Sequence, residues 1–309
     1  MKNRIIIICP YYGTLPANIE YTMLTMAKNS FVDWLILTDS EQILPSYTNI
    51  KIVKSIYDDL CELIRSRLET DIKSPYKLCD YRPAYGVLFE EYISGYDFWG
   101  HCDLDMIFGD LTKCFSEKIL NDYDKIFDQG HLALFRNNSD INTAYKKITC
   151  GSMDWKAIFN SPYSFIVDET YHGDHIGINE VLEQDGFRIF RDRTLYIDTI
   201  VRYKNLYVLN HSRKGNPYYL YDNGRVLLRY MGCNEQKEYI YAHFQKRKFA
   251  EIEPEASEPF VIVPKGFYKR NTVQKGDFYN KLSDLRLFWY IKFRIKRKLS
   301  NRKLQAQKG

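Results

Sequence analysis

The segment Asp103-Leu104-Asp105 has the residue types and spacing of a cation-binding site. It follows a strand-like run that contains Phe98 and Trp99, and it precedes the apolar residues 106–108. Carboxylates at positions i and i+2 of a strand point to opposite faces, but at a strand end, where the chain turns, both can converge on one divalent ion. Two Asp residues beside a buried strand are unfavourable unless they are paired or bind a metal. The pattern predicts a metal or ligand site, and the alternative is a structural salt bridge or a turn cap.

The same spacing occurs a second time, at Asp122-Tyr123-Asp124. This copy lies in a polar stretch with a helical pattern, so its carboxylates are expected to be solvated. The apolar residues on both sides of Asp103 and Asp105 distinguish the first copy from the second.

The elements that must position these carboxylates alternate between strand and helix. Apolar β-rich runs bounded by Pro, Gly or Asp are typical of strands buried on both faces, and segments with apolar residues three or four apart are typical of helices. Strands are expected at 5–9, 34–38, 50–53, 96–102, 132–136 and 187–190, and helices at 18–29, 56–69, 83–93 and 175–184. Such alternation predicts an α/β fold with a central mixed, mostly parallel sheet and flanking helices.

The last hundred residues are expected to be richer in β structure. The stretch 206–231 carries a hairpin turn at Asp222-Asn223-Gly224, and 238–243 resembles a strand that ends at His243. We expect a catalytic domain over 1–250, a linker with a late strand at 260–263 over 251–279, and a basic amphipathic helix over 280–309.

The charge is divided unevenly along the 309 residues. From Lys281 onwards ten Lys and Arg stand against one acidic residue, a net charge of +9, which leaves 34 basic against 38 acidic residues, or −4, for the preceding chain. This excludes a basic nucleic-acid-binding surface spread over the whole chain. The tail mixes its cations with aromatic residues such as Trp289, so we expect 281–309 to contact an anionic membrane peripherally, with packing on the acidic body as the alternative.

Seven cysteines, an odd number without a CxxC pair, suggest neither a disulfide framework nor a zinc site and are typical of reduced thiols in the cytosol. The apolar run 5–9 is too short for a signal peptide, and no stretch approaches the roughly 20 apolar residues of a membrane span. We therefore expect a cytoplasmic protein, peripheral on the inner face of the plasma membrane.

Four segments, taken in order, resemble GT-A-fold, nucleotide-sugar-dependent bacterial glycosyltransferases with a DxD motif, of the kind that synthesise capsule and lipopolysaccharide. They are the strand at 5–9 with Pro10-Tyr11-Tyr12-Gly13, then 77–82, then 101–105, and then His243-Phe244-Gln245-Lys246. The resemblance covers about residues 3–250 and implies a GT-A-like (Rossmann-like) fold.

The resemblance implies a role for each residue of the metal site. Asp105 would be the first ligand of Mn²⁺ or Mg²⁺, Asp103 would share the metal or hold the nucleotide ribose, and His243 would be the third ligand. Lys246 would neutralise phosphate. The departing diphosphate needs such a cation while the anomeric centre becomes oxocarbenium-like. For His243, an ordinary histidine at a strand end is an equal alternative.

The donor-binding residues are expected at the carboxyl ends of the first strands and at one helix start. Tyr11 or Tyr12 could stack on uracil, with a place in the core as the alternative, and Asp39 could meet base or ribose. The resemblance implies that Asp80 binds sugar hydroxyls and that Lys77 or Arg82 faces the phosphates. A local salt-bridge cluster is the alternative for these three residues.

The acceptor side is expected around 168–175, where ionisable residues are dense. If transfer inverts configuration, Asp174, Glu169 or His172 would take the acceptor's proton, whereas a retaining reaction needs no such base. A helix cap or a surface contact is the alternative for His172.

Together these expectations describe a hexosyltransferase that moves a sugar from a UDP-sugar to a saccharide or a lipid-linked saccharide in bacterial surface polysaccharide synthesis, without a nucleic acid partner. A sugar-nucleotide pyrophosphorylase is a second enzyme hypothesis, although the expected Gly-rich phosphate loop is missing. A nucleic-acid-binding protein that uses the basic tail is a hypothesis from another class.

Overall fold

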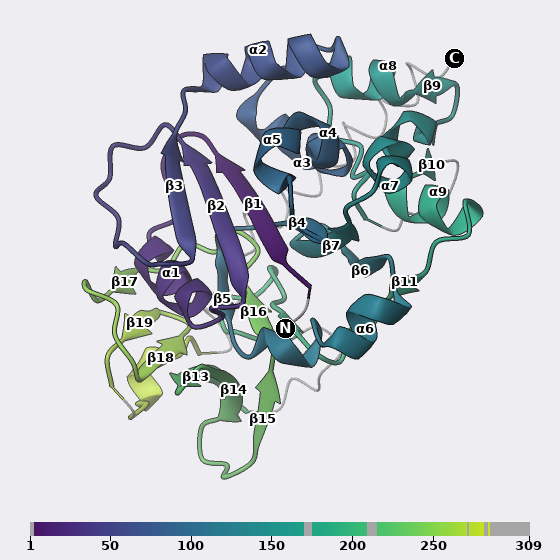
Figure 1. Cartoon of the computed structure of the whole chain (residues 1–309). Coiled ribbons are helices and arrows are strands. Elements are labelled where there is room, and N and C mark those ends of the chain that lie inside the picture. The colour runs from purple at the N-terminus through teal and green to yellow at the C-terminus, as the bar shows by residue number, and fades with distance from the viewer. Residues whose placement is uncertain (1–2, 170–174, 209–214, 271, 281–283, 285–309) are drawn as a thin grey trace.

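The computed structural model describes residues 3–169, 175–208, 215–270, 272–280 and 284. At its centre lies a seven-stranded sheet in the order β11-β6-β7-β4-β1-β2-β3 (Figure 1). Its strands are β1 (Ile5–Tyr11), β2 (Val32–Thr38), β3 (Ile50–Lys54), β4 (Phe98–Cys102), β6 (Lys125–Gln129), β7 (Leu132–Arg136) and β11 (Ile189–Phe190). The pairs β1–β2, β1–β4, β2–β3 and β6–β11 are parallel, whereas β7 is antiparallel to β4 and β6. The mixed, mostly parallel sheet that the sequence predicts is therefore confirmed.

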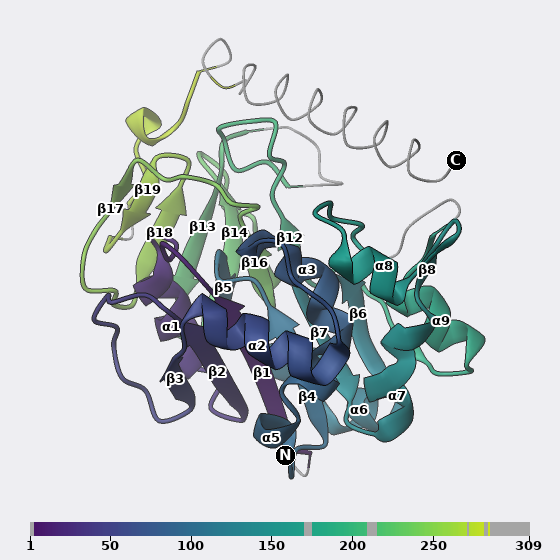
Figure 2. The same cartoon turned by 90° about the horizontal axis from the view of Figure 1, so that it is seen from above.

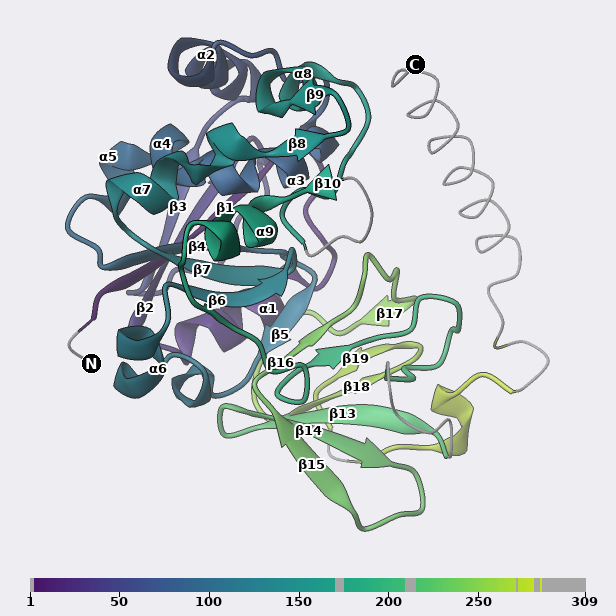
Figure 3. The ribbon, with the colours of Figure 1, turned by 90° about the vertical axis from the view of Figure 1, so that its right-hand side faces the viewer.

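Helices cover both faces of this sheet, which explains why its central strands are apolar throughout. Figure 3 shows α2, α4, α5, α7 and α8 on one side of the strands and α1 and α6 on the other. The longer helices are α1 (Ile19–Ala27), α2 (Tyr57–Leu68), α6 (Glu117–Asp122), α8 (Trp155–Asn160) and α9 (Ile178–Gln184). The shorter ones are α3 (Leu78–Tyr81), α4 (Tyr85–Leu88), α5 (Glu90–Ile93) and α7 (Ser139–Thr143), with 3₁₀ turns at Pro75–Lys77, Arg82–Ala84, Leu111–Lys113, Ala144–Lys147 and Lys275–Asp277.

A second, six-stranded sheet has the order β15-β14-β13-β18-β19-β17. Its apolar side chains pack against α1 and against Ile107 and Ala242. Figure 2 shows β17–β19 on one flank and α7–α9 on the other. Its strands are β13 (Pro217–Asp222), β14 (Arg225–Tyr230), β15 (Gln236–Tyr239), β17 (Glu251–Ile252), β18 (Phe260–Val263) and β19 (Gly266–Tyr268). The predicted hairpin at 222–224 and the predicted late strand are both present. Because β17, β18 and β19 complete the sheet that β13 begins, the segment 251–268 is part of a folded unit rather than a linker.

Two small sheets finish the fold. One joins β8 (Thr149–Cys150), β9 (Met153–Asp154) and β10 (His175–Ile176), and the other has the order β12-β16-β5, from β12 (Ile197–Asp198), β16 (Tyr241–His243) and β5 (Met106–Phe108). The predicted strand over 238–243 is thus two strands, β15 and β16, which belong to different sheets. The predicted helix over 83–93 is likewise divided, because Phe89 leaves helical geometry and is buried against Tyr85.

The predicted basic helix over 280–309 lies outside the described residues, apart from 280 and 284. Among the described residues, none of the helices has the length and apolar character needed to cross a membrane.

Candidate metal and donor site

The Asp103-Leu104-Asp105 segment forms the turn between β4 and β5. Strand β5 pairs with β16 so that His243 lies opposite Met106, and β12 pairs with β16 so that Asp198 lies opposite His243. These pairings bring three segments that are far apart in the sequence to the carboxyl end of β4. This is the edge of an open α/β sheet where ligands gather.

Two carboxylates and one imidazole converge at this edge. His243 Nε2 lies 3.5 Å from Asp103 Oδ2 and 3.7 Å from Asp105 Oδ1. One donor atom from each of the three residues falls within 4.8 Å of the others. Oxygen and imidazole donors suit Mn²⁺ and related divalent ions. Asp103 keeps a quarter of its side chain exposed, so a ligand can reach the group, and the donor set fits a bound divalent cation.

The other side of the His243 ring meets two residues that the sequence did not single out. Its Nδ1 lies 3.0 Å from Asp198 Oδ1, and its ring centroid lies 4.6 Å from that of His131. His131, Asp198 and His243 form a second group of clustered metal-binding residue types. His131 directly precedes the apolar run at 132–135, a signal that could have indicated it, whereas Asp198 ends a two-residue strand and no local pattern marks it.

The carboxylates determine the charge of the histidine. Burial alone would lower the pKa of His243, but hydrogen bonds to Asp103 and Asp198 and the charge of Asp105 raise it to about 10. Burial and the neighbouring His243 lower the pKa of His131 to about 3. Without a bound metal, His243 is therefore a cation at neutral pH and His131 is neutral. A divalent cation at this site would displace the Nε2 proton of His243.

Residues Gln245 and Lys246, which follow His243 closely in the sequence, both contact aspartates of the site. The Lys246 backbone N–H donates to Asp105 Oδ2, and the Gln245 side chain donates to Asp198 Oδ2 across 2.6 Å. The exposed Lys246 ammonium lies 3.9 Å from the centroid of the Tyr76 ring. Lys246 thus contacts Asp105 through its backbone, while its side chain lies against Tyr76.

Arg82 joins the Asp103–Asp105 turn to Asp168 in the segment that precedes α9. Its Nη1 donates to Asp168 Oδ2 across 2.7 Å and its Nη2 donates to Asp103 Oδ1. A Cβ placed on Gly130 would lie 2.5 Å from Asp168 Oδ2 and 2.8 Å from Arg82 Nη1. A glycine at 130 therefore allows this ion-pair cluster to pack against the backbone.

Glu169 lies beside the same glycine. Its Oε1 accepts a hydrogen bond from the Gly130 N–H across 3.2 Å. Burial and the charge of Asp168 raise the pKa of Glu169 to about 7. A half-buried carboxyl group with this pKa can accept or release a proton near neutrality. The other two acceptor-side candidates, His172 and Asp174, lie outside the described residues.

Lys77 and Asp80 occupy a different environment from the one expected. Their side chains are 1% and 0% exposed and lie 2.6 Å apart. Asp80 also accepts hydrogen bonds from the backbone N–H groups of Phe165 and Ile166. With its oxygens engaged inside the protein, Asp80 cannot meet a sugar hydroxyl without rearrangement. This geometry corrects the expected donor role and favours the alternative of a structural ion pair.

Of the two tyrosines expected near the nucleotide base, Tyr11 lies near Asp103 and Asp105, whereas Tyr12 lies in the hydrophobic core. Half-buried Tyr11 ends β1, and burial together with the nearby Asp105 and Asp103 raises the pKa of its phenol. Tyr12 is buried and its hydroxyl lies 3.0 Å from Ser55 Oγ, so it belongs to the core, not to a stacking surface. Asp39 accepts a hydrogen bond from the Gly13 N–H across 2.7 Å and thereby ties the ends of β1 and β2 together.

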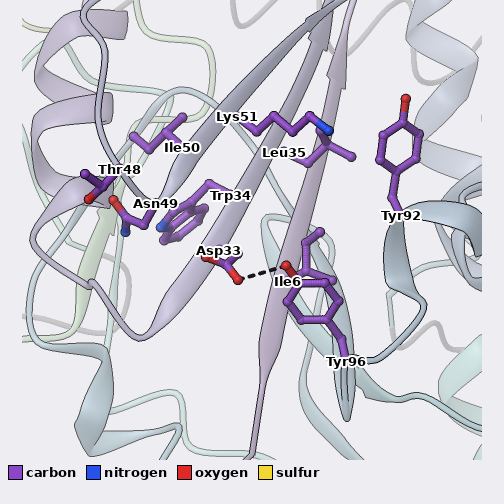
Figure 4. A pocket seen from close by; sticks show the side chains of 10 residues that line it. All are labelled: Ile6, Asp33, Trp34, Leu35, Thr48, Asn49, Ile50, Lys51, Tyr92 and Tyr96. Atoms are coloured by element: carbon purple, nitrogen blue, oxygen red, sulfur yellow. Dashed lines mark hydrogen bonds between the residues drawn. The ribbon is translucent and has the colours of Figure 1, made fainter.

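A cavity of about 280 Å³ lies at the opposite, amino ends of β1, β2 and β3. Figure 4 shows Tyr96 pointing toward Asp33, to which its hydroxyl donates across 2.8 Å, with Lys51 and Tyr92 further along the wall. Asp103, Asp105 and His243 are not among the residues that line this cavity.

The model of a family of unknown function (DUF6625) matches residues 7–271. A comparison with curated proteins gives no match. Among solved structures, the galactosyltransferase LgtC in complex with donor and acceptor sugar analogues is similar over 63% of this chain and 75% of its own, with 11% identity and a TM-score of 0.33.

Proposed function

The chain belongs to the DUF6625 family of unknown function, and we propose from the geometry of the site that it is a metal-dependent glycosyltransferase with a nucleotide-sugar donor, a UDP-sugar. The observation that carries this proposal is the convergence of Asp103, Asp105 and His243 at the carboxyl edge of a mixed α/β sheet. These residues would hold Mn²⁺ or Mg²⁺.

A divalent cation bound there would neutralise charge on the diphosphate as the bond to the sugar breaks. The protein would contribute the remaining interactions. Tyr11, which ends β1, would face the nucleotide, and the influence of Asp105 and Asp103 on the pKa of its phenol supports this role. Asp39, which follows β2, would contact the base or the ribose. Arg82, paired with Asp103 and Asp168, would face the donor phosphates from beside the Asp103–Asp105 turn.

On the acceptor side, in a reaction that inverts configuration, Glu169 would take the proton of the attacking hydroxyl. Its place beside Gly130 and the Arg82–Asp168 pair supports this role. The acceptor would be a saccharide or a lipid-linked saccharide of a bacterial surface polysaccharide such as capsule or lipopolysaccharide. For a lipid-linked acceptor, the basic tail after residue 280 would bring a cytoplasmic enzyme to the anionic inner face of the membrane.

The experiment is a thermal-shift screen of UDP-sugars with and without Mn²⁺, followed by measurement of UDP release from the sugar that stabilises the protein. We expect stabilisation by a UDP-sugar only when Mn²⁺ is present. Asp105→Asn should abolish Mn²⁺-dependent UDP release while the protein stays folded, because the amide is a poor metal ligand but can still accept the Lys246 N–H.

The matched control is Asp122→Asn, which changes the exposed aspartate of the second copy of the motif, at the end of α6. This variant should retain full activity. Undiminished UDP release by Asp105→Asn, or equal losses in both variants, would refute the proposed function.

A further inference from the structure

The orientation of the His243 ring is fixed by Asp198, a residue outside the Asp103, Asp105 and His243 group. Its Nδ1 lies 3.0 Å from Asp198 Oδ1, which leaves Nε2 to face Asp103 and Asp105 at 3.5 and 3.7 Å. Only one nitrogen of an imidazole can face a given ligand at a time. A ring turned over about its bond to Cβ would lose the hydrogen bond to Asp198 and point a carbon atom toward the aspartates.

Asp198 is itself held firmly. Its second oxygen accepts a hydrogen bond from Gln245 Nε2 across 2.6 Å. The next residue, Thr199, donates to the His243 carbonyl from its N–H at 3.2 Å and from its hydroxyl at 3.0 Å. Strand β12 therefore restrains both the backbone and the side chain of His243.

The segment after His243 connects Asp198 to the metal-binding turn. Gln245 and Lys246 have φ values of 51° and 57°, in the left-handed region that side-chain-bearing residues rarely adopt. In this conformation Gln245 reaches Asp198 with its side chain, and Lys246 reaches Asp105 with its backbone N–H. Two consecutive residues in an uncommon conformation are retained where the surroundings demand it, often at functional sites.

His131 restrains the same ring from its face. The two imidazole rings lie 4.6 Å apart between centroids and are tilted by 34°. His131 Nδ1 lies 3.1 Å from the Tyr241 hydroxyl, and the Asp103 N–H donates to the His131 carbonyl across 3.0 Å. Its buried Nε2 has no hydrogen-bond partner among the described residues. The face of His243 that His131 covers is therefore closed by a neutral ring with limited freedom.

We propose that Asp198 is a positioning residue that sets the affinity of the site for a divalent cation by acting through His243. A carboxylate on the far nitrogen of a metal-binding imidazole fixes the tautomer and the ring orientation and makes the ligand more basic. Asp198 does not touch the cation in this arrangement. The inference rests on the proposed function, because it assigns Asp198 to the cation site of that enzyme.

The test measures Mn²⁺ binding to the full-length protein by the electron paramagnetic resonance signal of free Mn²⁺, with and without UDP. We expect Asp198→Asn to bind Mn²⁺ about 10- to 100-fold more weakly than the wild type, which is the usual effect of losing an outer-shell carboxylate. Asp192→Asn is the matched control, since Asp192 caps Thr194 in the preceding turn and touches none of the site residues in the described structure. It should leave Mn²⁺ affinity unchanged.

A spectroscopic measurement separates positioning from a merely structural role. At saturating Mn²⁺, the electron spin-echo modulation from a coordinated imidazole nitrogen should be present in the wild type and weakened in Asp198→Asn, while urea unfolding without added metal shows both proteins folded. Equal Mn²⁺ affinities, or an unchanged nitrogen modulation, would overturn the role of Asp198. Failure of the wild type to bind Mn²⁺ would instead overturn the proposed metal-dependent function itself, together with this inference.

Discussion

Arg82 donates to Asp168 across 2.7 Å while its second terminal nitrogen donates to Asp103, so one guanidinium joins the Asp103–Asp105 turn to the segment that contains Asp168 and Glu169. The Arg82 side chain is 16% exposed and that of Asp168 is 3% exposed. Burial alone would raise the pKa of Asp103, but the charge of Arg82 lowers it well below its usual range. Arg82 therefore supplies the positive charge that keeps this part of the site ionised.

Replacement of Arg82 by Met should destabilise the protein by about 3–5 kcal/mol, because it leaves a buried carboxylate without its partner. Urea unfolding measures the loss. The double variant Arg82→Met/Asp168→Asn should lose less than the sum of the two single variants, since the carboxylate is then removed as well. Arg65→Met is the control, because Arg65 pairs with Asp71 at the surface and should contribute less than about 1 kcal/mol. Additive losses in the double variant would contradict the coupling.

The buried pair of Lys77 and Asp80 yields a second prediction. Because both side chains are almost fully buried, Lys77→Met should lower the free energy of unfolding by about 3–5 kcal/mol. The folded fraction should bind Mn²⁺ and UDP with the affinity of the wild type, measured by isothermal titration calorimetry. Lys156→Met, which breaks an exposed pair with Glu69, should change neither quantity appreciably. Weaker UDP binding without a loss of stability would restore the donor role first expected for Lys77.

The sequence was sufficient for the strands of the central sheet and for part of the site. Apolar runs bounded by Pro, Gly or Asp predicted β1, β2 and β3 to within two residues, since a strand buried on both faces leaves a continuous apolar signal. The same signal, ended abruptly by carboxylates, indicated Asp103 and Asp105.

The remaining site residues depend on pairings that local pattern cannot encode. Asp198 ends β12, which is two residues long and too short for any periodicity, and only its pairing with β16 brings it to His243. Lys77 and Asp80 show a second reason why the sequence could not predict the whole site. A ligand-binding site and an internal ion pair use the same residue types, so the sequence pattern does not distinguish them. Burial, which separates the two, is a property of the tertiary structure.

Lys125 gives a prediction about pH. Burial lowers the pKa of its ammonium group from 10.5 to about 7 in the folded protein, where it donates to the Phe127 carbonyl and to Asn179 Oδ1, each across 2.7 Å. Between pH 7 and 10.5 the unfolded chain therefore binds more protons at this position, so the contribution of Lys125 to stability rises with pH.

Other groups titrate in the same range, so the comparison must be made against a variant. From pH 7 to pH 9 the wild type should gain about 2 kcal/mol in stability relative to Lys125→Met, a figure that follows from the shift in pKa. Urea unfolding of both proteins at each pH measures this difference. The free energy of unfolding of Lys118→Met, which changes an exposed residue of α6, should vary with pH in the same way as that of the wild type. A constant difference between wild type and Lys125→Met would show that Lys125 keeps its proton when buried.

The proposed role of Glu169 yields a prediction about the pH dependence of sugar transfer. Its pKa is raised to about 7 by burial and by Asp168, and a group that accepts the acceptor's proton must first be deprotonated. The rate of sugar transfer should therefore rise with pH through about 7. Glu169→Gln should reduce kcat by a factor of about 10² to 10⁴ with Mn²⁺ and UDP binding retained, because the amide cannot take a proton. Glu183→Gln, which loosens an exposed pair with Arg191, should keep the wild-type rate and pH profile. An unchanged rate in Glu169→Gln would assign the proton to another acceptor.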